Sequence, residues 1–145
     1  MAQMMPDEGL DLWLGQFPKN DTRITTCYLC LFTSHTASTV ITHAQTMADI
    51  TEAAFTNYAR QALATATWGA LAERPTNLGR QTTYPQVTFP TVGASGATIN
   101  GFFVSDILST TGDKAVGQAN FDDLTAVPLA TNDVIKVTPT IALLH

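Results

Sequence analysis

Two cysteines and two histidines have the spacing of a metal-binding motif. Cys27, Cys30, His35 and His43 give the pattern C-x2-C-x4-H-x7-H, whose first three positions match a zinc knuckle. Both cysteines lie in an apolar run typical of a β-strand, where positions three apart face opposite sides. No Gly or Pro between them supplies a turn, and no helix begins at Cys27 to favour thioredoxin-type chemistry. We therefore expect two buried thiols and no metal site.

Nucleophilic catalysis would need a Ser or Cys beside a His and an orienting acid. The candidates are Ser34, which precedes His35, and Ser95 in the sequence Gly93-Ala94-Ser95-Gly96. The second sequence is not G-x-S-x-G, and no strand-turn-helix pattern surrounds it. Loop polarity accounts for both serines better than hydrolase chemistry does.

Adjacent carboxylates occur at Asp7 and Glu8 and at Asp122 and Asp123. Glycosidase chemistry needs two acids about 5–10 Å apart, one of them buried, whereas adjacent acids in polar segments are usually solvated. Asp122 and Asp123 lack the oxygen-rich loop that Ca²⁺ prefers. Neither a P-loop nor a dinucleotide fingerprint is present. We expect a protein that is not an enzyme and has no cofactor.

Composition narrows the classes of partner. The 145 residues are 45% apolar but only 13% charged, about half the usual share, with 24 Thr and 19 Ala. Seven basic against twelve acidic residues give a net charge of −5, which offers no basic field to a phosphate backbone or an anionic lipid. We expect no nucleic acid partner. Apolar runs are too short for a transmembrane helix and no signal peptide is visible, so we expect no membrane association either.

The first element expected is a short amphipathic helix over 7–17. Leu10, Trp13, Leu14 and Phe17 follow the i, i+3, i+4, i+7 spacing of one helix face. Pro18 ends the pattern because it cannot continue the hydrogen-bond ladder. This apolar face either packs on its own domain or, because the segment is terminal, contacts a partner.

The remaining chain reads mainly as short β-strands separated by Gly, Pro, Asn and Asp. The expected strands are 24–32, 59–65, 80–84, 86–89, 98–105, 115–118 and 134–144. Both faces of 24–32 are apolar, which indicates a strand buried on both sides. Pro139 predicts an edge position or a bulge in the last strand. The stretch 46–55 is compatible with one or two helical turns. Spacing of this kind is typical of a single-domain β-sandwich or jelly roll.

The order of several short motifs suggests a family. They are Pro6-Asp7-x-Gly9, Leu29-x-Leu31-Phe32-Thr33, Ile50-Thr-Glu-Ala-x-Phe55-x-x-Tyr58-Ala59, a strand with Trp68, Gly101-Phe-Phe-Val-x-Asp106, and Asp133-x-Ile-x-Val-x-Pro139-x-Ile141. This order resembles small virion structural proteins of tailed bacteriophages, of the type that decorates or cements the capsid shell.

The resemblance implies a β-sandwich or jelly-roll-like subunit that binds the major capsid protein on the outer surface of the head. It implies a homo-oligomer, often a trimer, that stabilises the shell after assembly in the host cytoplasm, and it brings no catalytic residue. On this interpretation residues 1–20 are an N-terminal arm with a short helix, and 21–145 form the β-domain.

A tail-fibre or baseplate component that binds a receptor or carbohydrate is the alternative, because sandwich folds also host such sites. It requires exposed aromatic side chains lining a groove, and the candidates are Trp68, Tyr84 and Phe102.

Overall fold

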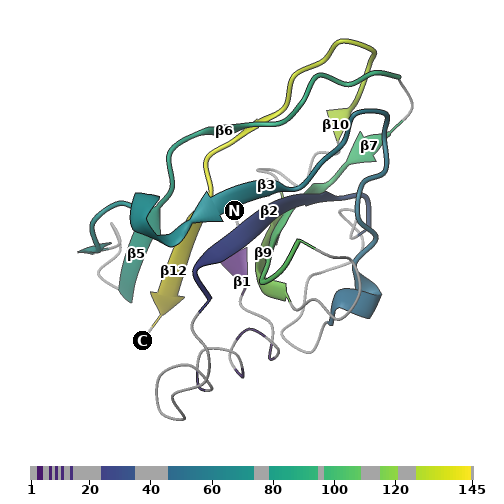
Figure 1. Ribbon diagram of the computed structural model, residues 1–145. Helices are drawn as coiled ribbons and strands as arrows, with labels where there is room; N and C mark the ends of the chain where they lie inside the picture. Colours follow the sequence, from purple (N-terminus) through teal and green to yellow (C-terminus); the bar gives the residue numbers. More distant parts are fainter. Residues whose placement is uncertain are drawn as a thin grey trace.

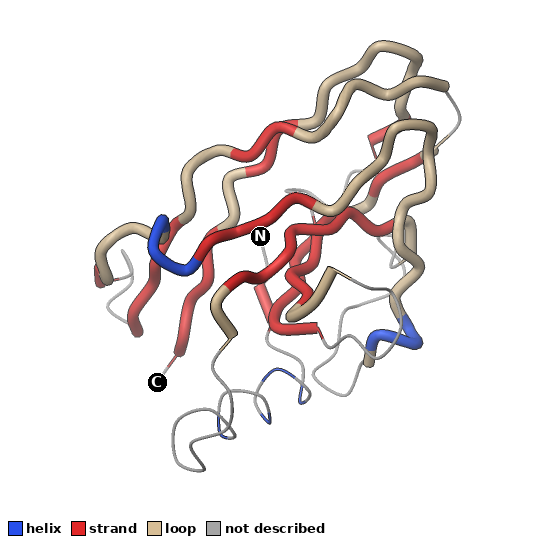
Figure 2. The backbone as a smooth tube through the Cα atoms, viewed as in Figure 1, coloured by secondary structure: helices blue, strands red, loops and turns tan. Residues whose placement is uncertain are grey.

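The computed structural model describes residues 3–4, 7, 9, 11, 14, 24–34, 46–73, 79–94, 97–108, 115–120 and 127–144. In these ranges the protein is mainly β, and all of its strands pair in the antiparallel direction (Figures 1 and 2). The mainly β class expected from the sequence is therefore confirmed.

The largest sheet has five strands in the order β1-β9-β8-β2-β3. Their bounds are Gln3–Met4 (β1), Ala115–Asn120 (β9), Gly101–Ser105 (β8), Thr26–Phe32 (β2) and Gln61–Ala64 (β3). Strand β2 lies inside the sheet because it pairs with β3 on one edge and β8 on the other. A central strand of this kind has its backbone groups satisfied on both edges.

Both faces of β2 are buried, as its sequence predicts. Leu29 and Leu31 belong to the main apolar cluster, whereas Cys30 and Phe32 belong to a second, smaller cluster with Ile50. The alternation of a strand separates the two sets, so one seven-residue segment supplies side chains to two cores.

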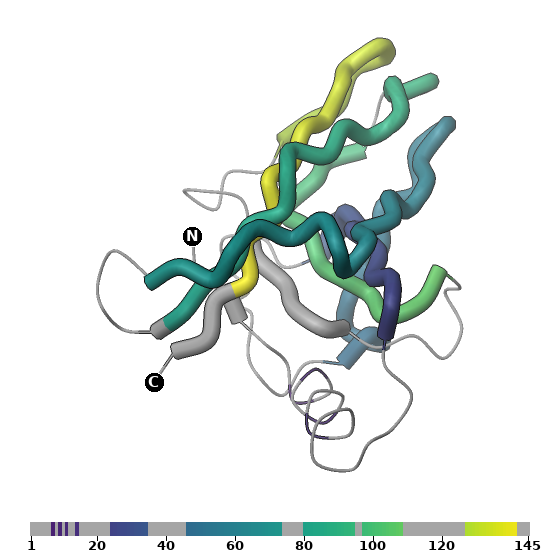
Figure 3. Tube along the Cα trace, turned by 60° about the vertical axis from the view of Figure 1, so that its left-hand side comes forward, coloured from purple at the N-terminus to yellow at the C-terminus, as the bar shows by residue number. Residues whose placement is uncertain are grey.

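The main cluster is completed by a long antiparallel ribbon in which residues 79–99 run beside 127–144 (Figure 3). Its paired segments are β5 (Gly79–Thr83) with β12 (Thr140–Leu144), β6 (Val87–Thr88) with β11 (Lys136–Val137), and β7 (Thr98–Ile99) with β10 (Val127–Pro128). Phe89, Ile99, Leu129 and Val137 of the ribbon are buried in the cluster with Leu29, Leu31 and Leu63 of the five-stranded sheet.

Pro139 lies at a register shift in the ribbon. Thr83 pairs with Thr140 and Val87 with Val137, so one residue is extra on the strand opposite Pro139. The carbonyl of Pro139 still accepts a hydrogen bond from the Tyr84 amide at 2.9 Å, although its own nitrogen cannot donate. The sequence predicts an edge position or a bulge at this proline; β12 is an edge strand of its sheet, and the extra residue lies on the facing strand.

A short segment joins the edges of two sheets. After β3 the chain forms the 3-10 turn η2 (Thr65–Thr67) and then β4 (Ala72–Glu73), which is the edge strand of the sheet β12-β5-β4. The segment from β3 to β4 therefore connects two sheet edges, and we call it the flank.

Gly93 marks a close contact between the ribbon and the loop after β-bridge residue Glu52. A side-chain carbon added at Gly93 would lie 2.7 Å from the Thr56 side chain, so only glycine fits there without movement. The Gly93 amide donates to the Thr56 carbonyl at 3.0 Å, and Asn57 adopts a left-handed backbone with φ 72°.

The two segments expected to contain helical turns have different outcomes. The helix expected over 7–17 is not seen as an element, because most of this stretch, with Leu10, Trp13 and Phe17, lies outside the described residues; Leu14 is 59% exposed. The stretch 46–55 contains one helical turn, the 3-10 turn η1 (Met47–Asp49), closed by a hydrogen bond from the Thr46 amide to Asp49, and then becomes extended. Pairing of Ala53 with β2 takes precedence over local helix formation.

The strands themselves agree with the sequence to within a few residues, except that β1, β4 and β10 were not expected. Across the described ranges, no helix has the length and apolar character needed to cross a membrane.

Candidate functional site

The most distinctive site lies where the chain leaves the edge of β2. Pairing between β2 and β3 ends at Leu29 and Gln61, and pairing resumes on the same edge where Phe32 bridges Glu52. Residues between Ala53 and Arg60 loop out of the ladder. The carbonyl of Leu31 is satisfied by the Ala53 amide at 2.9 Å, but the Leu31 amide faces the gap.

Tyr58 fills this gap with its side chain. Its hydroxyl accepts a hydrogen bond from the Leu31 amide at 3.1 Å and donates one to Glu52 Oε1 at 2.7 Å. The ring is held by an edge contact with Phe55, with centroids 5.2 Å apart, and by stacking on Phe89 at 6.1 Å. A side chain thus replaces the missing strand partner of a buried amide.

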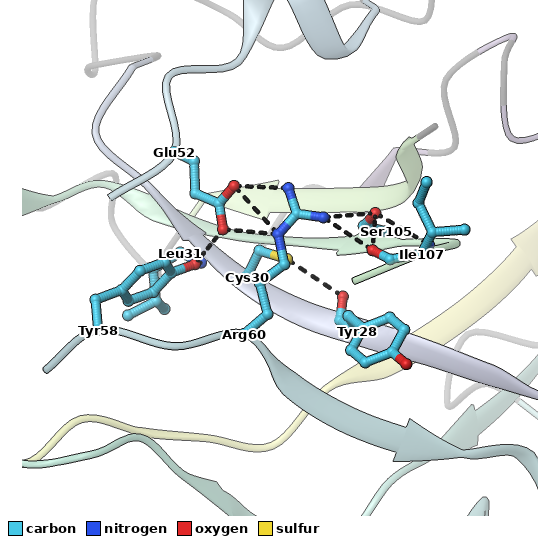
Figure 4. A network of polar contacts seen from close by, with 8 residues as sticks. All are labelled: Tyr28, Cys30, Leu31, Glu52, Tyr58, Arg60, Ser105 and Ile107. Carbon is cyan, nitrogen blue, oxygen red and sulfur yellow. Dashed lines mark hydrogen bonds and ion pairs between the residues drawn. The ribbon is translucent and has the colours of Figure 1, made fainter. Parts of the chain in front are cut away.

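Arg60 joins this arrangement to the end of β8 (Figure 4). Its Nε and Nη2 atoms donate to the two oxygens of Glu52 at 2.9 and 2.6 Å, and its Nη1 atom donates to Ser105 Oγ at 3.1 Å and to the Ile107 carbonyl at 2.9 Å. The guanidinium lies 5.9 Å from the centre of the Phe103 ring. Only 4% of the Arg60 side chain and 17% of the Glu52 side chain are exposed.

The electrostatics of the site favour a fixed protonation state for Tyr58. Burial raises the pKa of the Tyr58 hydroxyl far above its usual value, and the neighbouring Cys30 and Glu52 add to the rise. The hydroxyl therefore remains protonated and continues to donate to Glu52. Arg60 and Glu52 form a bidentate pair, the geometry in which a buried guanidinium is best compensated.

A shallow hollow of about 590 Å³ adjoins the network. It is lined by Glu52, Ala53, Ala54, Phe55, Tyr58, Ala59, Arg60 and Leu108. The polar atoms of Glu52 are engaged by Arg60 and Tyr58, so the carboxylate and guanidinium bind each other. The hydrogen bonds of this network connect the loop 53–60, β2 and the end of β8. The hollow beside them has a largely apolar lining, which suits contact with an apolar surface.

The two cysteines lie on opposite faces of β2. Cys27 packs partly buried against the main cluster, whereas Cys30 is buried in the second cluster, with its thiol 3.5 Å from the Tyr28 carbonyl. Two thiols on opposite faces cannot share a metal ion. His35 and His43 lie outside the described residues, and the described ones contain no group of three metal-ligating side chains.

Burial raises the pKa of the Cys27 thiol from 9.0 to about 11, and the carboxylate of Asp106 adds to the rise. A thiol with a raised pKa is a weak nucleophile at neutral pH.

The other polar residues singled out in the sequence do not assemble within the described ranges. Ser34 Oγ accepts a hydrogen bond from the Thr51 amide at 2.9 Å, which ties the chain after β2 to the segment before the loop. Asp7 is described and exposed. Glu8, Ser95, Asp122 and Asp123 lie outside the described residues.

The aromatic residues needed for a receptor groove are arranged differently from that expectation. Phe102 is 4% exposed and belongs to the main cluster, so it cannot line a surface groove. Trp68 and Tyr84 pack edge to face with centroids 5.2 Å apart and are partly buried against the same cluster. Phe102 is buried because it lies on β8, which pairs with the central strand β2.

Sequence reasoning missed the Glu52–Tyr58–Arg60 network. A usable signal was present: Arg60 is a lone cation in a stretch of small and apolar residues, with an acid eight positions earlier. Such a cation is expected to be paired if the stretch is buried.

Comparison with known proteins gives no family for this chain: no protein-family model matches it, and no curated protein matches it significantly.

We predict that Glu52→Gln destabilises the protein by about 3–5 kcal/mol, because Arg60 would remain buried without its counter-charge. Adding Arg60→Met should recover much of this loss, since both charges are then removed. Urea unfolding measures both values. Glu73→Gln, at an exposed position in β4, is the control and should change the free energy of unfolding by less than about 0.5 kcal/mol. A Glu52→Gln effect as small as that of the control would contradict the structural role.

Tyr58→Phe should cost about 1–3 kcal/mol, because the Leu31 amide loses its acceptor while the ring contacts remain. Tyr84→Phe is the matched control, since the Tyr84 hydroxyl makes no hydrogen bond to a described residue. Hydrogen exchange should also accelerate at the Leu31 amide in Tyr58→Phe. Equal stability of the two variants would show that the hydroxyl is dispensable.

Cys27 should react slowly in the folded protein. At pH values below 9 its thiolate fraction should be roughly 100-fold lower than in the unfolded chain, given a pKa of about 11 against 9.0. Iodoacetamide labelling of a Cys30→Ala variant, with and without urea, measures this ratio. Because the folded pKa is the higher one, the stabilisation is complete below pH 9 and is lost as pH rises through about 11. A labelling midpoint near pH 9 in the folded protein would disprove the shift.

Proposed function

We propose that this chain is a non-enzymatic structural subunit of a tailed-phage virion, a decoration or cement protein that binds the major capsid protein on the outer surface of the head. Two observations support the proposal: the resemblance of the sequence motifs to such proteins, and the apolar side chains that the described residues expose. In this role the protein stabilises the shell by contact area and uses no cofactor.

The observation that carries the proposal is that large apolar side chains are exposed in two neighbouring pairs. Leu108 is 60% exposed beside Ile107 at 37%, at the hollow next to Arg60. Val127 and Val134 are 41% and 49% exposed and line a second hollow of about 350 Å³ on the ribbon. Apolar side chains in neighbouring pairs, on a chain with few charges, favour contact with other proteins.

The chemistry of the buried charges supports the same proposal. Arg60 and Glu52 bind each other, and they also bind the Tyr58 hydroxyl, the Ser105 hydroxyl and the Ile107 carbonyl, so this polar cluster has a structural role. We also infer that the five-stranded sheet and the ribbon are the two layers of a β-sandwich, because one apolar cluster draws side chains from both.

The receptor-binding alternative draws no support from the positions of Trp68, Tyr84 and Phe102. The first two pack on each other, and the third is buried.

The test is co-sedimentation of the purified protein with phage heads that lack it. We expect saturable binding, and we expect deletion of residues 1–17 to weaken it by about tenfold or more, equivalent to about 1.4 kcal/mol. The deletion should lower the melting temperature little, because among the described residues of 1–17 only Gln3 and Met4 pair with another strand. No binding of the full chain would overturn the proposed function. Unchanged binding by the truncated chain would overturn the role of the arm alone.

A further inference from the structure

The flank formed by β3, η2 and β4 has an unusual composition. From Gln61 to Ala72 the chain has twelve residues without a charge or a proline. Most of them are exposed, including Ala62, Ala64 and Leu71, which is 67% exposed. Edge strands in monomeric proteins are commonly protected by lysines, prolines or bulges, and this flank has none of the three among its paired residues.

The backbone of β3 leaves hydrogen-bonding groups facing outward. Thr65 donates to the Thr25 carbonyl at 3.3 Å, so the inward-facing residues of the ladder are Gln61, Leu63 and Thr65. By the alternation of an antiparallel pair, the amide and carbonyl of Ala62 and the amide of Ala64 face away from β2, whereas the Ala64 carbonyl is the N-cap acceptor of η2. No described strand pairs with this side of β3, which is the last strand of its sheet.

We propose that the outer edge of β3 pairs with β3 of a second copy of this chain. Antiparallel self-pairing centred on Leu63 places Ala62 opposite Ala64 of the other copy. In each such pair the Ala64 amide donates to the Ala62 carbonyl of the other copy, because both of these groups face outward. The two five-stranded sheets become one continuous sheet across a two-fold axis.

The absence of charged residues on the outer edge of β3 favours a second copy of this chain as its partner. A charged edge would meet its own charge across a two-fold axis, whereas a neutral edge meets no repulsion. Ala62 and Ala64 have short, exposed side chains, so two such strands can approach without steric conflict. The contact goes beyond the proposed function, and it predicts a dimer in solution, unlike the trimer implied by the resemblance.

Ala64→Pro is a sharp test of this pairing. Ala64 has φ −65° and an extended backbone, which proline adopts without strain, and its amide faces away from β2. The substitution therefore removes an outward donor and leaves the β2–β3 ladder intact. Ala62→Lys is a second variant, which places a charge on the edge without changing the backbone. Ala130→Lys, at an exposed alanine in the turn after β10, is the matched control.

Sedimentation equilibrium of the full chain should give a mass twice 15.5 kDa for the unaltered protein and for Ala130→Lys. Ala64→Pro and Ala62→Lys should each raise the dimer dissociation constant by tenfold or more, with unchanged circular dichroism. A monomeric or trimeric unaltered protein would overturn the proposal, as would a folded Ala62→Lys dimer of undiminished affinity. Head binding by a monomeric chain would reject the β3 contact while leaving the proposed function in place.

Discussion

The backbone amide of Leu31 is the constraint on which the described fold depends. It lies on a strand buried on both faces, at the point where the neighbouring chain loops away. An unpaired amide at such a position costs as much as a lost hydrogen bond, so a partner must be brought to it. Tyr58 supplies that partner, Glu52 orients Tyr58, and Arg60 fixes Glu52 to the end of β8. One backbone group thus accounts for the positions of three linked side chains.

The interior and the described surface use charged and apolar side chains differently. The interior uses an arginine and a glutamate to hold loop 53–60, β2 and β8 in one geometry, with Phe55 and Phe89 enclosing the tyrosine ring. The described surface, by contrast, carries exposed apolar side chains and an uncharged edge. The few charges of the chain thus include a pair that is used inside the fold.

Much of the β-structure could be predicted from alternation and turn residues, because these are local signals. The two buried faces of 24–32 and the edge position of β12, which follows Pro139, are examples. The Glu52–Tyr58–Arg60 network could not be predicted in this way. Its three residues come together only in the register that β2 adopts against its two neighbouring strands. In the stretch 46–55 the expected helical turn forms at 47–49, but pairing of Ala53 with Leu31, which is not a local signal, draws the rest into an extended form. Short strands such as β4 carry too few residues to show a period.

Cryo-electron microscopy of virions that carry the protein is the best test of the proposal that it stabilises a capsid shell by contact area. Ordered copies are expected at repeated positions on the head, with apolar residues such as Leu108 or Val127 at the contacts. Density confined to the tail, or none on the shell, would contradict it.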